Sequence, residues 1–116
     1  MMIYEGSCHC GRNLFEVDGE LVQALECNCS HCARKGYLLW FVPRETFRLM
    51  TPENHLAVYT FNRHVIQHHF CLHCGCAPFG FGVNPSGAAT VAVNVRCLEG
   101  IELTDLKRVP FDGRAL

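Results

Sequence analysis

Charged residues are scarce in this chain, and neither sign is in excess. Of 116 residues, ten are Lys or Arg and eleven are Asp or Glu, so the formal net charge is -1 with the seven histidines neutral. Proteins that bind a phosphate backbone carry a basic patch or stripe. The composition therefore disfavours nucleic acid as a partner.

Long hydrophobic runs are also missing. The apolar run 38–42 is among the longest, and about 20 apolar residues are needed to cross a bilayer. The first five residues have neither the basic nor the apolar region of a secretory signal. We therefore expect a soluble protein with no membrane contact that stays in the reducing cytoplasm, where disulfides are rare.

Amphipathic runs with a helical period do not extend beyond about ten residues. Short alternating segments separated by Gly, Pro and Asn turns take their place, a pattern typical of an all-β domain. In one of them Leu14 and Glu16 face one side while Phe15 and Val17 face the other. The length suits a single domain, 1–116. Strands are expected at 3–7, 13–17, 21–26, 38–42, 47–49, 56–61, 64–70, 79–83 and 90–95.

Two of these strand predictions go further. The strand 38–42 is continuously apolar, so we expect it to be buried on both faces. The strands 56–61 and 64–70 are expected to form a hairpin across Asn62–Arg63. Between 26 and 38 we expect a loop that carries cysteines and is held by a strand at each end.

Cysteine is abundant, with nine residues. The odd number, and two Cys-x-Cys pairs whose own disulfides would be strained, favour metal binding over a disulfide framework. Zinc is the metal that thiolate clusters of this kind usually hold. Seven of the cysteines lie in three runs: Cys8-His9-Cys10-Gly11, Cys27-Asn28-Cys29-Ser30-His31-Cys32 and Cys71-Leu72-His73-Cys74-Gly75.

The two outer runs supply four thiols, which are enough to close a tetrahedral zinc site. One zinc held by Cys8, Cys10, Cys71 and Cys74 would join the first hairpin to the last sheet. Structural zinc contributes about 10 to 16 kcal/mol of apparent folding free energy in small zinc-dependent peptides. This site is therefore expected to hold the fold together.

The central run has three thiols within six residues. Zinc bound by three thiolates keeps its fourth position for water or a substrate sulfur, which distinguishes a reactive site from a structural one. Cys27, Cys29 and Cys32 are therefore the candidate catalytic ligands. The alternative is a second closed site with a fourth protein ligand. Four residues are candidates for that ligand: His9, His31, Cys76 and Cys97.

Four motifs follow one another along the chain: Gly6-Ser7-Cys8-His9-Cys10-Gly11, Cys27-Asn28-Cys29-Ser30-His31-Cys32, Phe70-Cys71-Leu72-His73-Cys74-Gly75 and Val93-Asn94-Val95-Arg96-Cys97-Leu98. In this order they resemble the glutathione-dependent formaldehyde-activating enzyme family, over residues 4–100. The resemblance implies small antiparallel sheets and two zinc ions per chain. One is structural, at the four outer cysteines, and one is catalytic, at the three central cysteines.

In the enzyme that gives this family its name, glutathione and formaldehyde combine reversibly to S-hydroxymethylglutathione. The resemblance therefore implies a zinc-dependent carbon-sulfur lyase that acts on an adduct of glutathione, or of another small thiol, with an aldehyde such as formaldehyde. This chain is much shorter than the full-length enzyme, which leaves the identity of the thiol open. A non-catalytic, zinc-stabilised binding module is the alternative.

Residues beside the central run are candidates for contact with the substrate. When a thiolate attacks an aldehyde, the adduct oxygen gains charge, and Ser30 is a candidate donor to that oxygen. Arg34 is a candidate to bind a substrate carboxylate, and a merely solvated side chain is the alternative. His31 is expected to point away from the metal. Cys76 and Cys97 are expected to pack as small apolar side chains.

Overall fold

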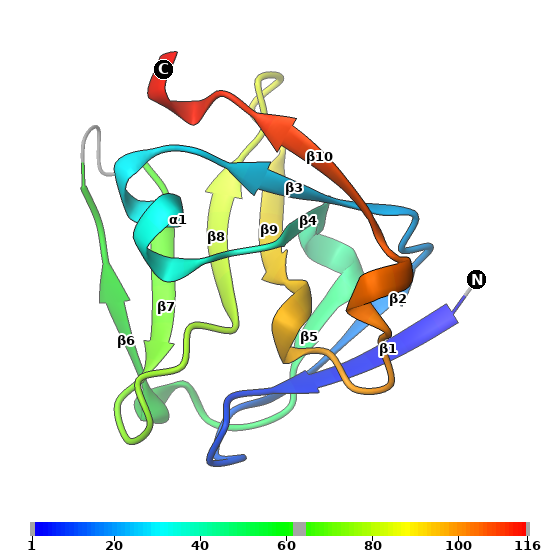
Figure 1. Ribbon diagram of the computed structural model, residues 1–116. Helices are drawn as coiled ribbons and strands as arrows, with labels where there is room; N and C mark the ends of the chain where they lie inside the picture. Colours follow the sequence, from blue (N-terminus) through cyan, green and yellow to red (C-terminus); the bar gives the residue numbers. More distant parts are fainter. Residues whose placement is uncertain (1, 62–64, 116) are drawn as a thin grey trace.

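The computed structural model describes residues 2–61 and 65–115 and consists of two sheets and one short helix (Figure 1). A three-stranded sheet has the order β1-β2-β5, and a seven-stranded sheet has the order β10-β3-β4-β9-β8-β7-β6. The strands are β1 (Met2–Ser7), β2 (Leu14–Gly19), β3 (Gln23–Cys27), β4 (Leu39–Pro43), β5 (Phe47–Leu49), β6 (Leu56–Tyr59), β7 (Gln67–Cys71), β8 (Phe79–Val83), β9 (Ala89–Asn94) and β10 (Lys107–Phe111).

The helical elements are short. The helix is α1 (Ser30–Lys35), and the 3-10 turns are η1 (Arg44–Thr46), η2 (Glu53–His55), η3 (Val95–Cys97), η4 (Leu103–Asp105) and η5 (Gly113–Ala115). Among the described residues no helix is long and apolar enough to cross a membrane.

The all-β prediction is confirmed, with two corrections. The segment predicted as a cysteine-bearing loop contains α1, which is six residues long and therefore too short to show a helical period. Strand β10 was not predicted, and it pairs in parallel with β3, so the larger sheet is not purely antiparallel. Pro110 interrupts the strand pattern of this segment, and it is tolerated because β10 lies at the sheet edge.

The hairpin predicted from 56 to 70 is confirmed in its strands, since β6 pairs antiparallel with β7 from Leu56↔Cys71 to Tyr59↔His68. The turn predicted at Asn62–Arg63 lies outside the described residues. Strand β8 continues the sheet beyond this hairpin and pairs with both β7 and β9. Strand β7 therefore has a neighbour on both sides, and Cys71 at its end pairs with Leu56 of β6.

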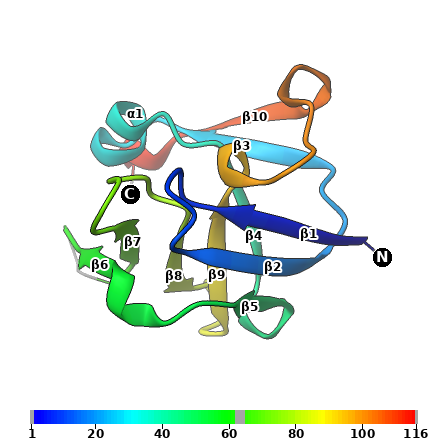
Figure 2. The same ribbon diagram turned by 90° about the horizontal axis from the view of Figure 1, so that it is seen from below.

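The main core lies between the two sheets. Figure 2 shows β1 and β2 in front of β4 and β9, and one cluster joins buried side chains of β2, β4, β5, β8 and β9. Phe15 and Val17 are buried as the alternation predicted. The Phe15 ring stacks on Phe47 with 5.3 Å between ring centroids.

The prediction that 38–42 is buried on both faces is wrong for one residue. Leu38 and Val42 are buried between the sheets, but Phe41 is 50% exposed. Phe41 points to the opposite face of β4, which borders an open cavity instead of another layer. This continuously apolar strand therefore has one face in the core and one on the cavity.

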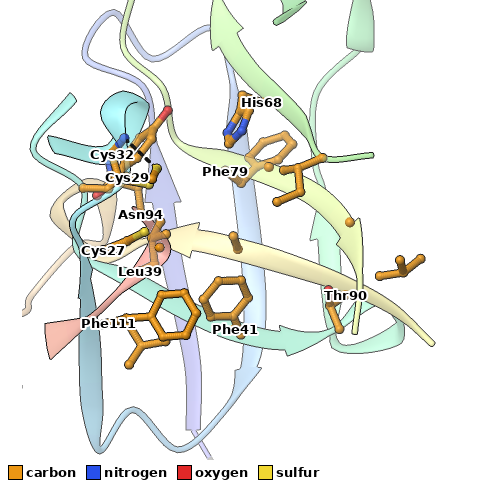
Figure 3. Close-up of a pocket in the computed structure, with 18 of the residues that line it drawn as sticks. Cys27, Cys29, Cys32, Leu39, Phe41, His68, Phe79, Thr90, Asn94 and Phe111 are labelled. Carbon is orange, nitrogen blue, oxygen red and sulfur yellow. Dashed lines mark hydrogen bonds between the residues drawn. The ribbon is translucent and has the colours of Figure 1, made fainter. Parts of the chain in front are cut away.

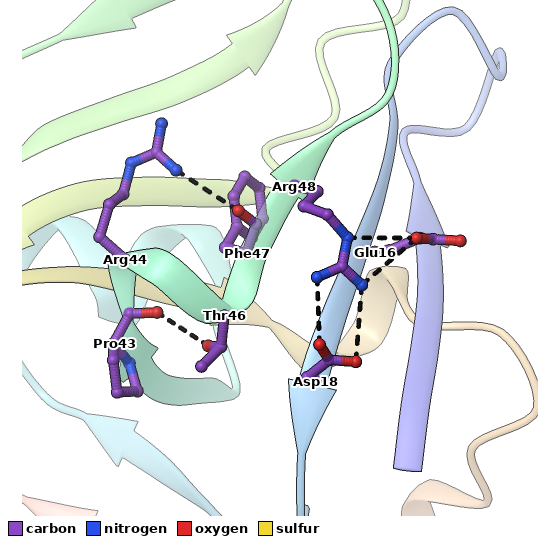
Figure 4. Close-up of polar contacts among 7 residues, drawn as sticks. All are labelled: Glu16, Asp18, Pro43, Arg44, Thr46, Phe47 and Arg48. Atoms are coloured by element: carbon purple, nitrogen blue, oxygen red, sulfur yellow. Dashed lines mark hydrogen bonds and ion pairs between the residues drawn. The ribbon is translucent and has the colours of Figure 1, made fainter.

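A polar contact on the outside of the small sheet joins β2 to β5 (Figure 4). The Arg48 guanidinium contacts Glu16 at 3.3 Å and Asp18 at 3.1 Å. These side chains are partly exposed, and such pairs contribute about 0 to 1 kcal/mol. They support the register of the two strands, while stability comes mainly from the core and from the cysteine sites described next.

Candidate metal centres

Four cysteines from the outer runs meet at one point. Cys8 and Cys10 come from the turn after β1, while Cys71 ends β7 and Cys74 follows it. All four Sγ atoms lie within 4.8 Å of one another, and the Cys8–Cys10 and Cys10–Cys71 sulfur pairs are each 3.6 Å apart. A tetrahedral zinc with Zn–S of ~2.3 Å would space its sulfurs ~3.8 Å apart. The donor set therefore fits a closed zinc site.

Backbone hydrogen bonds reach these sulfurs, and burial opposes them. Burial leaves the pKa of Cys71 raised, whereas the pKa of Cys74 is lowered. The N–H groups of His73 and Cys74 donate to Cys71 Sγ at 3.3 and 3.4 Å. Burial by itself would raise the pKa of Cys74, but backbone hydrogen bonds at Cys10 and Cys76 outweigh burial and lower this pKa to about 6. The turn that carries Cys74 closes at Gly75, which has φ of +78° and suits glycine.

Asn13 also supports this cluster, although no sequence motif pointed to this residue. Its side chain is 0% exposed, and Nδ2 donates to Cys8 Sγ at 3.6 Å and to the His55 carbonyl at 3.4 Å. A buried amide that donates to sulfur stabilises the thiolate. Asn13 stands one residue before β2, and the sequence predicted it only as the first residue of the strand 13–17.

The three central cysteines form a second cluster at the start of α1. Cys27 ends β3, Cys29 is the N-cap of α1, and Cys32 lies in its first turn. Their Sγ atoms lie within 4.8 Å of one another, and no fourth Cys, His, Asp or Glu of the described chain joins them. The Cys32 N–H donates to Cys29 Sγ at 3.3 Å. This set can hold zinc through three sulfurs and leave one position open.

Two of the three thiols, Cys27 and Cys32, resist ionisation when no cation is beside them. At Cys29 burial is outweighed by hydrogen bonds, first of all the one from the Cys32 N–H, so the pKa of that thiol is lowered. Burial is the largest cause that raises the pKa of Cys32, and the neighbouring Cys29 and Cys27 raise it further. Burial also raises the pKa of Cys27. A divalent cation among the three sulfurs would remove this penalty because it stabilises the charged form. The chemistry of the cluster is therefore that of a metal site.

The cluster opens on a cavity of about 210 Å³. Figure 3 shows the cysteines at one end and the rings of Phe41 and Phe111 beside them. Most of its wall is apolar. The other lining residues are Leu25, Tyr37, Leu39, Phe61, Ile66, His68, Phe79, Gly80, Gly82, Val83, Thr90, Ala92, Asn94 and Gly113.

The C-terminal segment, residues 108–115, covers the other side of the cluster and is tied to Asn28. The Asn28 N–H donates to the Phe111 carbonyl at 3.1 Å, and Asn28 Nδ2 donates to Asp112 at 2.9 Å. Arg114 donates to the Asn28 side-chain oxygen at 3.0 Å and to its carbonyl at 3.1 Å. A Cβ at Gly113 would collide with Cys27 Sγ. Only glycine lets the chain pass this close to the cluster.

His31 points away from the cysteines and joins an aromatic group with His68. Their ring centroids are 4.3 Å apart, and Tyr37, Tyr59 and Phe61 surround them. Burial, and then the charge of Lys35, lower the pKa of His31. His31 Nδ1 is buried without a partner among the described residues. Both imidazoles are therefore neutral at pH 7.

We expect His68 to titrate near pH 4. Burial is the main cause that lowers its pKa to about 4, and the charges of His31, His69 and Lys35 add to it. Because the folded pKa lies below the ordinary 6.5, the stability linked to His68 is complete above pH 6.5 and is lost towards pH 4. An NMR titration of the His68 ring resonances measures this directly, and a midpoint near 6.5 would contradict it.

The remaining predicted residues lie outside the cavity lining. Ser30 begins α1, and Arg34 donates to the Ser30 carbonyl at 2.9 Å from an exposed position. Their roles as substrate contacts stay predictions. Cys76 and Cys97 belong to neither cluster. Burial, and then the neighbouring Cys76, raise the pKa of Cys97 to about 12, which fits a packed thiol that does not ionise.

Comparison with known proteins agrees with this arrangement. Residues 3–107 match the family described as glutathione-dependent formaldehyde-activating enzyme. The fold is similar to the crystal structure of a Rhodobacter sphaeroides protein solved as a structural genomics target, with a TM-score of 0.80 and 31% sequence identity. The match covers 91% of this chain and 97% of that one. All seven clustered cysteines lie within the matched residues.

Proposed function

The chain belongs to the glutathione-dependent formaldehyde-activating enzyme family, and from this premise we propose that it is a zinc-dependent carbon-sulfur lyase. Its substrate is the adduct of a small thiol with an aldehyde such as formaldehyde. Glutathione is the thiol that the family name supplies. The observation that carries the proposal is the three-cysteine cluster at the end of a cavity, with no fourth ligand among the described residues.

In this proposal each chain holds two zinc ions with separate tasks. Cys8, Cys10, Cys71 and Cys74 hold the structural ion, since four thiolates leave no position for a substrate. The three sulfurs of Cys27, Cys29 and Cys32 hold the other. Zinc bound there would supply a cation that lowers the pKa of a substrate thiol, so that the thiol ionises near neutral pH.

The reaction joins the thiol sulfur to the carbonyl carbon and moves the thiol proton to the carbonyl oxygen. In the reverse direction the carbon-sulfur bond breaks, and the hydroxyl proton returns to the sulfur. The cavity residues orient the two partners and exclude water. Tyr37 lines the cavity, and burial raises its pKa to about 12, so its hydroxyl stays protonated and is able to donate to the oxygen of the adduct.

Native mass spectrometry of zinc-loaded protein with added thiol tests the open site. We expect two zinc ions per chain and one thiol bound in addition, because an open position accepts a sulfur ligand. Glutathione and small uncharged thiols should be tried separately. Two zinc ions with no thiol from any of them would favour the alternative, a closed zinc-stabilised binding module.

We also propose a cytoplasmic location. All nine cysteines are free thiols, and the proposed function needs seven of them reduced. An oxidising compartment would join neighbouring thiols into disulfides. Fractionation of cells with an antibody against the protein would test this placement.

A further inference from the structure

The wall of the cavity beside the three cysteines points to a class of substrate. On the basis of the function proposed above, we propose that the adduct handled here carries an uncharged apolar group of about the size of a benzene ring. The formaldehyde adduct of glutathione is then not the preferred substrate. Three observations support this inference: the lack of charged side chains in the wall, the volume of the cavity, and the chain segments that form the wall.

No Lys, Arg, Asp or Glu is among the described residues that line the cavity. Its polar side chains other than cysteine are Tyr37, His68, Thr90 and Asn94. The Asn94 amide is already used, since Nδ2 donates to the Ala77 carbonyl at 3.1 Å and Oδ1 accepts from the Arg96 N–H at 3.2 Å. Glutathione has two carboxylates and an ammonium group. A buried charge without a partner costs several kcal/mol, so these groups would have to stay in solvent outside the cavity.

Four of the described cations, on α1, η3 and η5, make their contacts with residues outside the cavity lining. Lys35 Nζ lies 5.9 Å from the centroid of the Phe70 ring, and Phe70 is not a lining residue. Three arginines donate to backbone carbonyls instead. These contacts are Arg34 Nη1 to Ser30 at 2.9 Å, Arg96 Nε to Gly36 at 3.0 Å and Arg114 Nε to Asn28 at 3.1 Å.

The size of the cavity fits a ring better than a tripeptide. An apolar cavity of about 150 Å³ binds benzene, and pockets for drug-sized ligands run from about 300 to 1,000 Å³. The cavity here measures about 210 Å³. The rings of Phe41, Phe79 and Phe111 border it (Figure 3), and aromatic walls favour an aromatic or branched aliphatic group.

Part of this wall lies beyond the residues that the family match covers. The family match ends at residue 107, whereas Phe111 and Gly113 line the cavity from the C-terminal segment. Phe111 is held there through its carbonyl, which accepts from the Asn28 N–H at 3.1 Å. The apolar character of the cavity can therefore differ from that of a relative with the same seven cysteines.

Competition binding to the zinc-loaded protein tests the inference. Three pairs are compared by native mass spectrometry: benzyl mercaptan with formaldehyde, glutathione with phenylacetaldehyde, and glutathione with formaldehyde. We expect one of the pairs with a ring to bind at least about tenfold more tightly than the third. Tightest binding of the first pair would show that the thiol carries the ring, and tightest binding of the second would show that the aldehyde carries it. Equal or tighter binding of glutathione with formaldehyde would overturn the inference.

A substitution at the rim gives a matched control. Phe41 lines the cavity and Val58, on β6, does not, although both are 50% exposed. Phe41→Arg should lower the preference for the ring about tenfold, while Val58→Arg should leave it unchanged. If Phe41→Arg does not fold, Phe111→Arg decides, since Phe111 is also exposed and lines the cavity. An unchanged preference in a folded variant would refute the role of the wall.

Binding and turnover separate this inference from the proposed function. Exchange of the ¹³C-labelled form of its own aldehyde, formaldehyde or phenylacetaldehyde, into each thiol adduct measures turnover. If no pair exchanges faster than it does without protein, the lyase proposal fails. The order of binding still decides whether the cavity selects an apolar group.

Discussion

Cys74→Ser is expected to unfold the chain at room temperature. Its thiol joins a cluster that connects the turn after β1 to the turn after β7. Structural zinc is worth about 10 to 16 kcal/mol in small zinc-dependent peptides, and whole domains are stable by about 5 to 15 kcal/mol. The loss of one of four ligands removes much of that contribution. Near-UV circular dichroism and a thermal melt in excess zinc would measure the effect.

Cys76→Ser is the matched control for this experiment. Cys76 lies two residues further along the same turn, has intermediate exposure like Cys74, and takes no part in the cluster. It should melt close to the unsubstituted protein. The structural role of the four-cysteine site would be refuted if Cys74→Ser and Cys76→Ser melted at the same temperature.

Cys29→Ser is expected to abolish turnover while the fold persists. Cys29 Sγ accepts the Cys32 N–H as the N-cap of α1, and serine is a preferred N-cap residue. The helix therefore keeps its cap while the cluster loses a thiolate. Native mass spectrometry should count one zinc ion in place of two, and adduct exchange should fall to the spontaneous rate.

The result for Cys29→Ser also tests the division into two sites. Any change in stability should stay within about 1 kcal/mol, the usual size of an N-cap effect. If the variant unfolds as Cys74→Ser does, both clusters are structural. If it keeps two zinc ions and full exchange, another group completes the site.

The cysteine spacing predicted both clusters because each run is a tight turn that presents its own thiols. The alternation of Phe15 and Val17 likewise predicted the buried face of β2. Helix α1 has only six residues and shows no period, so the sequence read as a loop. Strand β10 was missed because Pro110 and the charged residues beside it do not resemble a strand.

Contacts between distant segments had no local signal. Asn28 stands between two cysteines and reads as a turn residue, although its partners are Asp112 and Arg114. Glycine is needed at 113 because the Cβ of any other residue would lie only 3.1 Å from the Cβ of Cys29. The cavity wall is made by residues that are far apart in the sequence and come together only in the fold. The charge of the wall and the volume of the cavity could therefore not be predicted.

The attachment of the C-terminal segment at Asn28 separates two properties that small enzymes often keep in the same residues. The seven clustered cysteines are the candidate metal ligands and lie within the residues that the family match covers. Phe111 and Gly113 lie beyond the matched residues and line the cavity, and Gly113 also passes close to Cys27 and Cys29. Substitutions at Phe111 can therefore change selectivity without loss of folding, and engineering of new substrate ranges should begin there.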